Sequence, residues 1–268
     1  MMIKLDYRFL AAVSVAATVV AAVSLAPHAQ GFVRPNNCVA PAEMTKFERP
    51  LSRTAKLLVN DKPLSIVAYG SSSTAGAGAS SSGASYPSRL EVELKERFPL
   101  RSISVRNRGV GGTEMPDMIA SMEKNLPADK PDLVVWQLGT NSLLRDRVLS
   151  SASERINEGL SKIKATGADV ILINPQYAPK VFVKPEALHM VKIIAGAAKE
   201  ASVNVFDRFA IMRHWRLAQN MAFKDFLSPD ELHMNDWSYG CTAKLLAKAI
   251  KEAATRPALT ATAPAPAR

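Results

Sequence analysis

The sequence contains no run of five or six basic residues, no nucleic-acid-binding motif and no internal repeat. Its 34 lysines and arginines against 24 acidic residues give a formal net charge of +10, which can attract nucleic acid, anionic lipid or acidic polysaccharide. Because the basic residues are scattered, we interpret this charge as a solvated basic surface. We therefore expect no nucleic-acid partner, whereas transient contact with anionic envelope material stays open. No oligomeric state follows from the sequence.

Charge is also missing from one long apolar stretch near the N-terminus, residues 9–26. Lys4 and Arg8 precede this stretch, and small or polar residues follow it at positions 27–31. A basic segment, an apolar run and a small-residue zone in that order are typical of an export signal. The run is short for a transmembrane helix, so an uncleaved anchor is the alternative. We predict a signal peptide or N-terminal anchor over 1–31 and a periplasmic or secreted protein.

Cysteine is scarce, since Cys38 and Cys241 are the only two. In an oxidising compartment such an isolated pair is a candidate disulfide. The bridge would fasten the N-terminal arm, residues 32–62, to the last helix, and it would add up to ~5 kcal/mol in the chain-entropy picture. Two buried free thiols are the alternative.

The rest of the chain alternates between short apolar runs and amphipathic segments. A length of 268 residues with 47% hydrophobic residues favours one large domain with a real core. Strands are predicted at 64–69, 102–107, 132–138, 169–173 and 203–206, and helices at 52–59, 86–98, 115–125, 153–165, 186–201 and 237–254. Residues 71–85 and 175–185 are predicted loops, and 255–268 a disordered Pro/Ala tail. The alternation predicts a parallel sheet with helices on both faces within a domain spanning 63–254.

Polar groups follow three of these strands directly. Residues 71–73 are serines, 107–112 (NRGVGG) are rich in glycine, and 139–141 read GTN. In a parallel sheet these three loops emerge at one edge. A hydroxyl, unobstructed glycine N–H groups and a carboxamide are the parts of a nucleophile with an oxyanion hole. Taken singly, each loop is also consistent with an ordinary strand-to-helix turn.

A serine nucleophile needs a base, and the chain has four histidines. His28 falls in the signal region, His189 on a predicted helix, and His214 between two arginines. His233 follows Asp230 by three residues, so a tight turn can bring the carboxylate onto the imidazole ring. We therefore predict His233 as the base and Asp230 as its orienting acid.

These blocks together resemble the SGNH hydrolases, also called GDSL-type esterases, over roughly residues 65–248. The first block, GSSSTAG at 70–76, corresponds to GDSxTxG and makes Ser72 the nucleophile. Gly112, the GTN at 139–141 and the Asp230–His233 pair correspond to the remaining blocks in order. The resemblance implies a three-layer, flavodoxin-like α/β fold of about five parallel strands. It also implies an oxyanion hole built from Ser72, Gly112 and Asn141, and neither a metal nor an organic cofactor.

Two residues depart from the family pattern, because Ser71 and Ser142 stand where the family carries aspartates. The first change puts the geometry of the loop in question. The second removes a carboxylate beside the amide donor. Together they motivate the hypothesis that the site accepts an anionic substrate.

The resemblance predicts an exported serine esterase that works through an acyl-serine intermediate. The sequence lacks a longer apolar segment that could form a lid over a lipid chain. O-acetyl esters of cell-envelope or extracellular carbohydrate are therefore favoured over lipid substrates. A lipase, lysophospholipase or thioesterase is the first alternative, and an O-acyltransferase to a glycan is the second. Residues 209–226, rich in Met, aromatic and basic residues, form either a helix packed on the core or a substrate rim.

Overall fold

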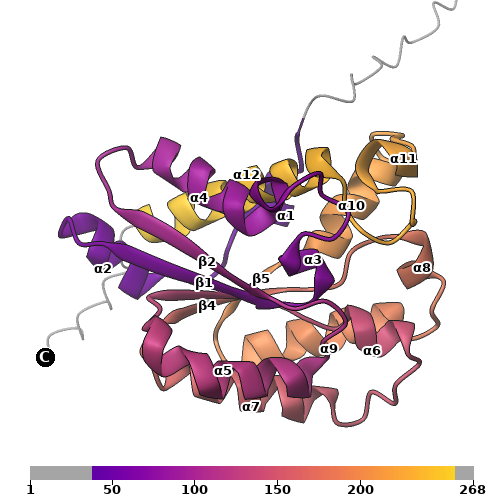
Figure 1. Ribbon diagram of the computed structural model, residues 1–268, viewed down its shortest axis with the longest axis horizontal. Coiled ribbons are helices and arrows are strands. Elements are labelled where there is room, and N and C mark those ends of the chain that lie inside the picture. Colours follow the sequence, from indigo (N-terminus) through magenta and orange to yellow (C-terminus); the bar gives the residue numbers. More distant parts are fainter. Residues whose placement is uncertain (1–37, 257–268) are drawn as a thin grey trace, which may run out of the picture. The chain divides into compact units, whose positions relative to one another are not determined.

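Five parallel strands form the central sheet of the computed structural model, which describes residues 38–256 (Figure 1). Their order is β2-β1-β3-β4-β5, and each neighbouring pair is parallel. The strands are β1 (Leu64–Gly70), β2 (Ile103–Gly109), β3 (Leu133–Gln137), β4 (Asp169–Ile173) and β5 (Asn204–Phe206). All five lie where the apolar runs predict them, and the predicted α/β class with a parallel sheet is confirmed.

The strand order places a topological switch next to β1. The chain passes from β1 to β2 on one side and then returns to β3 on the other side. At such a point the following connections leave in opposite directions and open a crevice at the carboxyl ends of the strands. Residues that directly follow β1 and β3 therefore border this crevice.

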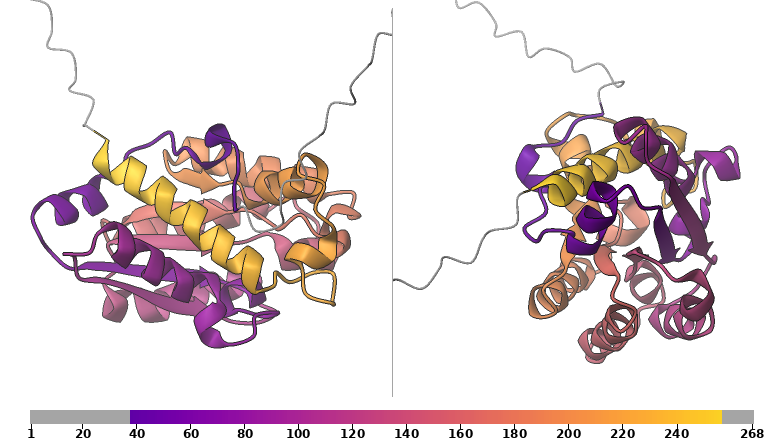
Figure 2. Two further views of the ribbon diagram at one scale, coloured as in Figure 1. Left: turned by 90° about the horizontal axis from the view of Figure 1, so that it is seen from above. Right: turned by 90° about the vertical axis from the view of Figure 1, so that its left-hand side faces the viewer.

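Helices cover both faces of the sheet (Figures 1 and 2). One face carries α5 (Met115–Asp129), α7 (Ala152–Lys164) and α9 (Ala187–Glu200). The other carries α4 (Tyr86–Arg97) and α12 (Asp236–Thr255), which pack on each other. The shorter helices are α1 (Ala42–Thr45), α2 (Ser52–Val59), α3 (Ser72–Ala75), η1 (Ser82–Ala84), α6 (Thr140–Leu144), α8 (Pro179–Phe182), α10 (Arg208–Leu217) and α11 (Phe223–Phe226).

Helix α5 continues past residue 125, where the sequence predicts its end. Pro127 lies inside the last turn, and the helix ends at Asp129. The Asp129 side chain is fully buried and accepts hydrogen bonds from Arg106 and Arg108 at 2.6 Å each. A proline removes one backbone hydrogen bond, and the pairing of Asp129 with two arginines offsets that loss.

The predicted loops at 71–85 and 175–185 contain short helices instead of continuous irregular backbone. Residues of α3 donate to the Ser71 carbonyl, and Gly76 ends this helix in the left-handed conformation (φ 102°). Helix α8 lies within 175–185. These helices escaped prediction because a single turn is too short to show a hydrophobic period.

The arm is anchored to the domain from residue 38 onward. Cys38 and Cys241 form a disulfide with Cα atoms 5.3 Å apart. Phe47 and Leu51 are buried, and Arg256 donates to the Phe47 carbonyl at 2.8 Å. The predicted signal or anchor at 1–31 and most of the tail at 255–268 lie outside the described residues. Between residues 38 and 256, no helix has the length and apolar character needed to cross a membrane.

Candidate active site

Ser72 lies at the carboxyl end of β1, in a segment that we call the serine turn (residues 70–76). Ser72 is half-buried and opens α3. Its N–H has no acceptor among the described residues, as expected for the first N–H of a helix. The turn therefore presents a hydroxyl and a backbone donor on the same residue.

Close packing holds the serine turn in place. A Cβ at Gly70 would lie 2.1 Å from Thr74 Oγ1, and one at Gly109 would lie 2.3 Å from the Ala75 nitrogen. A larger residue at Gly109 would displace the backbone of Thr74 and Ala75, and one at Gly70 would displace the side chains of Thr74 and Gln137. The Asn107 side chain adds a hydrogen bond to the Thr74 carbonyl at 2.8 Å.

His233 bridges the serine turn and Asp230. Its Nε2 lies 2.8 Å from Ser72 Oγ, and its Nδ1 lies 2.5 Å from Asp230 Oδ2. The imidazole is mostly covered, with 16% of its side chain exposed, whereas 43% of the Asp230 side chain is exposed. A hydroxyl, an imidazole and a carboxylate in this chain can pass the serine proton to the ring while the carboxylate faces the resulting cation.

The Asp230 carboxylate is held ionised by its surroundings in the Asp–His loop (residues 228–233). Partial burial raises its pKa, but hydrogen bonds from His233, Ser228 and two backbone N–H groups outweigh that effect and lower the pKa well below the usual range. Ser228 Oγ donates at 2.7 Å, and the N–H groups of Leu232 and His233 donate at 3.0 and 2.9 Å. The carboxylate therefore keeps its charge, and its orientation, throughout the neutral range.

The glycine loop, residues 110–114, lies beside the serine turn. Val110 donates to the Gly70 carbonyl at 3.0 Å, which joins the two segments. Gly112 has a positive φ of 78°, and its N–H donates to no group within residues 38–256. Asn141, in α6 shortly after β3, donates through Nδ2 to the Thr113 carbonyl at 2.8 Å, which leaves one amide hydrogen. The three predicted oxyanion donors thus come from adjoining segments at the same edge of the sheet.

The two residues that depart from the family pattern have different surroundings. Ser71 is buried, and its N–H and Oγ both donate to Gln137 Oε1, at 3.0 and 3.1 Å. Ser142 donates to Glu114, which also accepts from Arg145 at 2.7 Å. A carboxylate from the glycine loop therefore lies beside the position where the family aspartate is missing. The hypothesis of an anionic substrate gains no support from these two residues.

Buried polar residues beneath the site were missed by the sequence analysis. Gln176 accepts from Thr140 Oγ1 and from Arg208 Nη2, both at 2.9 Å, and donates to the Leu232 carbonyl at 3.2 Å. It thereby links the residue before Asn141 to the residue before His233. Arg208 pairs with no carboxylate within the described residues, and burial lowers its pKa to about 10, so it stays charged at neutral pH.

One signal could have identified part of this network. Gln137 is a polar residue inside the apolar run of β3, and it is fully buried. A buried polar side chain in such a run needs partners, which here are Ser71 and Thr74.

The other histidines lie apart from this group. His189 is exposed on α9 and pairs with Glu186 at 2.8 Å, whereas His214 lies on α10. His28 falls outside the described residues. Among residues 38–256, no three His, Cys, Asp or Glu side chains gather where they could hold a metal ion.

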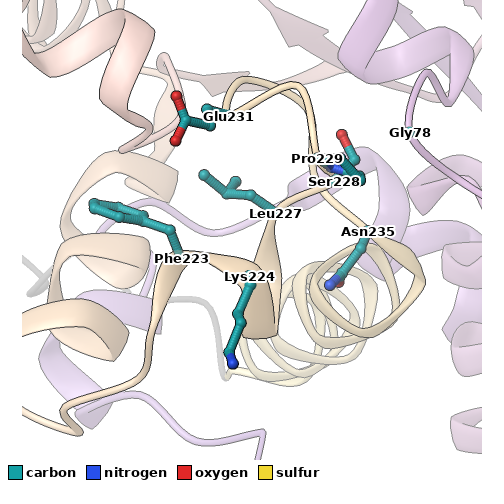
Figure 3. Close-up of a pocket in the computed structure, with 8 residues that line it drawn as sticks. All are labelled: Gly78, Phe223, Lys224, Leu227, Ser228, Pro229, Glu231 and Asn235. Atoms are coloured by element: carbon teal, nitrogen blue, oxygen red, sulfur yellow. The ribbon is translucent and has the colours of Figure 1, made fainter.

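Residues 209–226 pack partly on the core and partly border a cavity, and their role as a substrate rim stays a prediction. Phe209, Met212 and Trp215 of α10 are buried in the core. Phe223 of α11 is half-buried and stacks on Phe182 with ring centroids 5.8 Å apart. It also borders a cavity of about 510 Å³ behind the Asp–His loop (Figure 3). The cavity is lined by Gly78, Phe223, Lys224, Leu227, Ser228, Pro229, Glu231 and Asn235.

The family follows from a match that spans most of the chain. Residues 37–256 match the non-GDSL lipase-like family. The chain belongs to this family. Its description agrees with the serine turn, where Ser71 replaces the aspartate of the GDS pattern. The resemblance to the SGNH hydrolases that the sequence predicts is confirmed. No curated protein sequence matches this member of the non-GDSL lipase-like family.

Solved structures share the fold of this family member. A two-domain esterase active on acetylated mannans matches with a TM-score of 0.67 and 20% identity, over 84% of this chain and 60% of that protein. An acetyl xylan esterase matches with a TM-score of 0.59 and 21% identity, over 69% and 99%. A lipolytic G-D-S-L family member from Veillonella parvula matches with a TM-score of 0.59 and 16% identity, over 69% and 97%. The chain therefore spans about 60% of the length of the two-domain esterase.

Proposed function

We propose that the protein is a serine esterase that hydrolyses carboxylic esters through an acyl-serine intermediate. The observation that carries this proposal is the chain of contacts from Ser72 Oγ to His233 Nε2 at 2.8 Å and from His233 Nδ1 to Asp230 at 2.5 Å. The unpaired N–H groups of Ser72 and Gly112 lie in the two adjoining segments. Nucleophile, base, orienting acid and oxyanion donors are the complete set that acyl transfer needs.

In the first step, Ser72 Oγ attacks the ester carbonyl carbon while His233 Nε2 takes the hydroxyl proton. Asp230 orients the ring and faces the imidazolium. The carbonyl oxygen becomes an oxyanion that the N–H groups of Ser72 and Gly112 and the Asn141 amide stabilise. Collapse breaks the bond to the alcohol, which leaves with the proton from His233, and the acyl group stays on Ser72.

In the second step, water replaces the alcohol. His233 takes a proton from the water as its oxygen attacks the acyl carbon, and the same donors stabilise the second oxyanion. Collapse returns the proton to Ser72 Oγ and releases the carboxylic acid. The enzyme is thereby restored without any other reactant.

We propose O-acetyl esters of carbohydrate as the substrates. Of the proteins with a similar fold, one is an esterase active on acetylated mannans and another is an acetyl xylan esterase. The cavity behind the Asp–His loop, with Phe223 and polar residues in its lining, adds a concave surface of mixed character next to the site. We also propose export, supported by the basic and apolar N-terminal segment and by the disulfide between Cys38 and Cys241.

A panel of chromogenic esters with increasing acyl length, read beside acetylated glycans, tests this proposal. Wild-type protein is expected to favour acetyl esters and to release free acetate. Ser72→Ala is expected to lower kcat by about 10⁴-fold or more with the fold retained. Ser73→Ala, one residue along the same turn, is the matched control and is expected to keep most of the rate.

Different outcomes contradict different parts of the proposal. If Ser72→Ala keeps its activity, or if a serine-directed phosphonate labels another residue, the assignment of the nucleophile is wrong. A preference for long acyl chains indicates a lipase or thioesterase. Acetyl transfer to an added glycan, in place of acetate release, indicates an O-acyltransferase.

A further inference from the structure

Helix α6 and its C-cap residue, Arg145, provide two side chains that bind consecutive carbonyl groups of the glycine loop. Asn141 Nδ2 donates to the Thr113 carbonyl, and Arg145 Nη2 donates to the Gly112 carbonyl, both at 2.8 Å. Residues four apart lie on the same side of a helix, so Asn141 and Arg145 reach the loop from adjacent turns. The guanidinium also donates through Nη1 to Glu114 Oε1 at 2.7 Å, at the end of the same loop.

Almost nothing else packs against this part of the glycine loop. A Cβ at Gly111 would meet no atom within 4 Å. At Gly112 it would meet only Arg145 Nη2, at 3.6 Å. Gly112 has no side chain that could fix this peptide, and its positive φ is a conformation that other residues rarely adopt. Within the loop, the Thr113 N–H and Oγ1 donate to the Val110 carbonyl at 3.4 and 2.8 Å, which closes a turn over residues 110–113. The direction of the Gly112 N–H therefore depends on this turn and on the hydrogen bonds that the Gly112 and Thr113 carbonyls receive.

We infer that Arg145 is a positioning residue that aims the Gly112 N–H at the oxyanion. This inference rests on the proposed function, because it needs an oxyanion at that place. Without Arg145, the peptide that follows Gly112 loses its donor, and the loop can rotate about Gly112. The N–H then stabilises the transition state less than before, whereas binding of the uncharged ground state changes little.

Arg147 provides a matched control on the same short segment. It also donates to Glu114 Oε1, at 3.3 Å, but it has no hydrogen bond to Gly112. Both arginines are exposed, with 44% and 61% of the side chains of Arg145 and Arg147 accessible. Replacement of either one removes one positive charge beside Glu114, and only replacement of Arg145 frees the Gly112 carbonyl.

Steady-state kinetics on an acetyl ester, with thermal unfolding of each variant, test the inference. Arg145→Ala is expected to lower kcat by about 10- to 100-fold, less than complete loss of an oxyanion donor, with KM within about twofold of wild type. The rate of inactivation by a serine-directed phosphonate, which also develops an oxyanion, should fall by a similar factor. Arg145→Lys, which keeps one donor, should regain part of the rate, and Arg147→Ala should stay within about twofold of wild type.

Three results would overturn the inference. A kcat for Arg145→Ala within about twofold of wild type would show that the loop needs no clamp. An equal fall in kcat for Arg147→Ala would show that the effect comes from the lost positive charge. A rise in KM for Arg145→Ala with kcat unchanged would show that Arg145 contacts the substrate instead. If Arg145→Ala unfolds, Arg145→Lys against Arg147→Lys decides by the same criteria. Ser72→Ala in the same assay separates the two proposals, because retained activity there removes the proposed function whatever Arg145 does.

Discussion

The serine turn and the glycine loop adjoin at the carboxyl ends of β1 and β2, yet different forces hold them. The serine turn is closely packed, because a Cβ at Gly70 would lie 2.1 Å from Thr74 Oγ1 and one at Gly109, at the end of β2, would lie 2.3 Å from the Ala75 nitrogen. In the glycine loop, a Cβ at Gly111 would meet no atom within 4 Å. Hydrogen bonds hold that loop instead, from the side chains of Asn141 and Arg145 and from Val110 and Thr113 of the loop itself.

The difference indicates how each region responds to change. Steric contacts with backbone atoms cannot relax locally, so a change in the serine turn costs folding free energy. A loop held by side-chain hydrogen bonds can move without disturbing the core. Changes there are expected to lower the rate of the reaction while stability is preserved.

Among changes around the glycine loop, removal of the Asn141 side chain is expected to lower kcat the most. Asn141→Ala deletes an oxyanion donor and also the donor to the Thr113 carbonyl. We expect kcat to fall by about 10²- to 10³-fold, with little change in the free energy of unfolding. Steady-state kinetics and urea unfolding check this.

Asn125→Ala is the control for the Asn141 prediction, because Asn125 Nδ2 likewise donates to a backbone carbonyl, that of Ser121 in α5. A fall in kcat for Asn125→Ala comparable to that for Asn141→Ala would contradict the role assigned to the site. A large loss of stability in Asn141→Ala would show that the glycine loop, like the serine turn, contributes to folding stability.

A pair of glycine substitutions tests whether packing fixes the serine turn but not the glycine loop. Gly109→Ala places a methyl group 2.3 Å from the Ala75 nitrogen, and overpacking of this kind costs about 1 to 3 kcal/mol of unfolding free energy. Gly111→Ala enters empty space and should change stability by less than about 0.5 kcal/mol. Equal stability of the two variants in urea unfolding would show that the serine turn is not fixed by packing.

The smallest effect is expected from the charge of Asp230 in the Asp–His loop. Its folded-state pKa is depressed, mainly because hydrogen bonds to the carboxylate outweigh burial, so its contribution to stability is present above the unfolded pKa of about 3.9. That contribution is lost as the pH falls from about 4 toward the folded pKa. The difference in unfolding free energy between wild type and Asp230→Asn should therefore shrink as the pH falls below about 4. A difference that stays constant from about pH 5 down to about pH 2 would contradict the depressed pKa of Asp230.

Much of the sheet could be predicted from the sequence because its strands are apolar runs bounded by polar residues. Residues 132–138 are one case, since the run leaves little other than a buried strand. The end of α5 could not be predicted in this way. The contacts that carry the helix past Pro127 come from Arg106 and Arg108 on β2, and a local pattern does not include such partners.

Some residues of the candidate site could be predicted from the sequence, and others could not. Ser72, Asp230 and His233 belong to motifs whose residue types and order are visible in the sequence. Arg145 and Gln176 are not, because the groups that they bind include the carbonyls of Gly112 and Leu232. Every residue has a backbone carbonyl, so nothing in the identity of the partner points to the contact.

The 161 residues between Ser72 and His233 also set an order in time. At about 5 to 20 residues per second, the ribosome adds the histidine roughly 8 to 30 seconds after the serine. Strands β2 to β5 are all synthesised within that interval, and β1 precedes it. A growing chain thus carries Ser72, the proposed nucleophile, long before His233, the proposed base, and hydrolysis through this pair can begin only after residue 233 has been added. The appearance of activity therefore reports that both ends of the domain have come together.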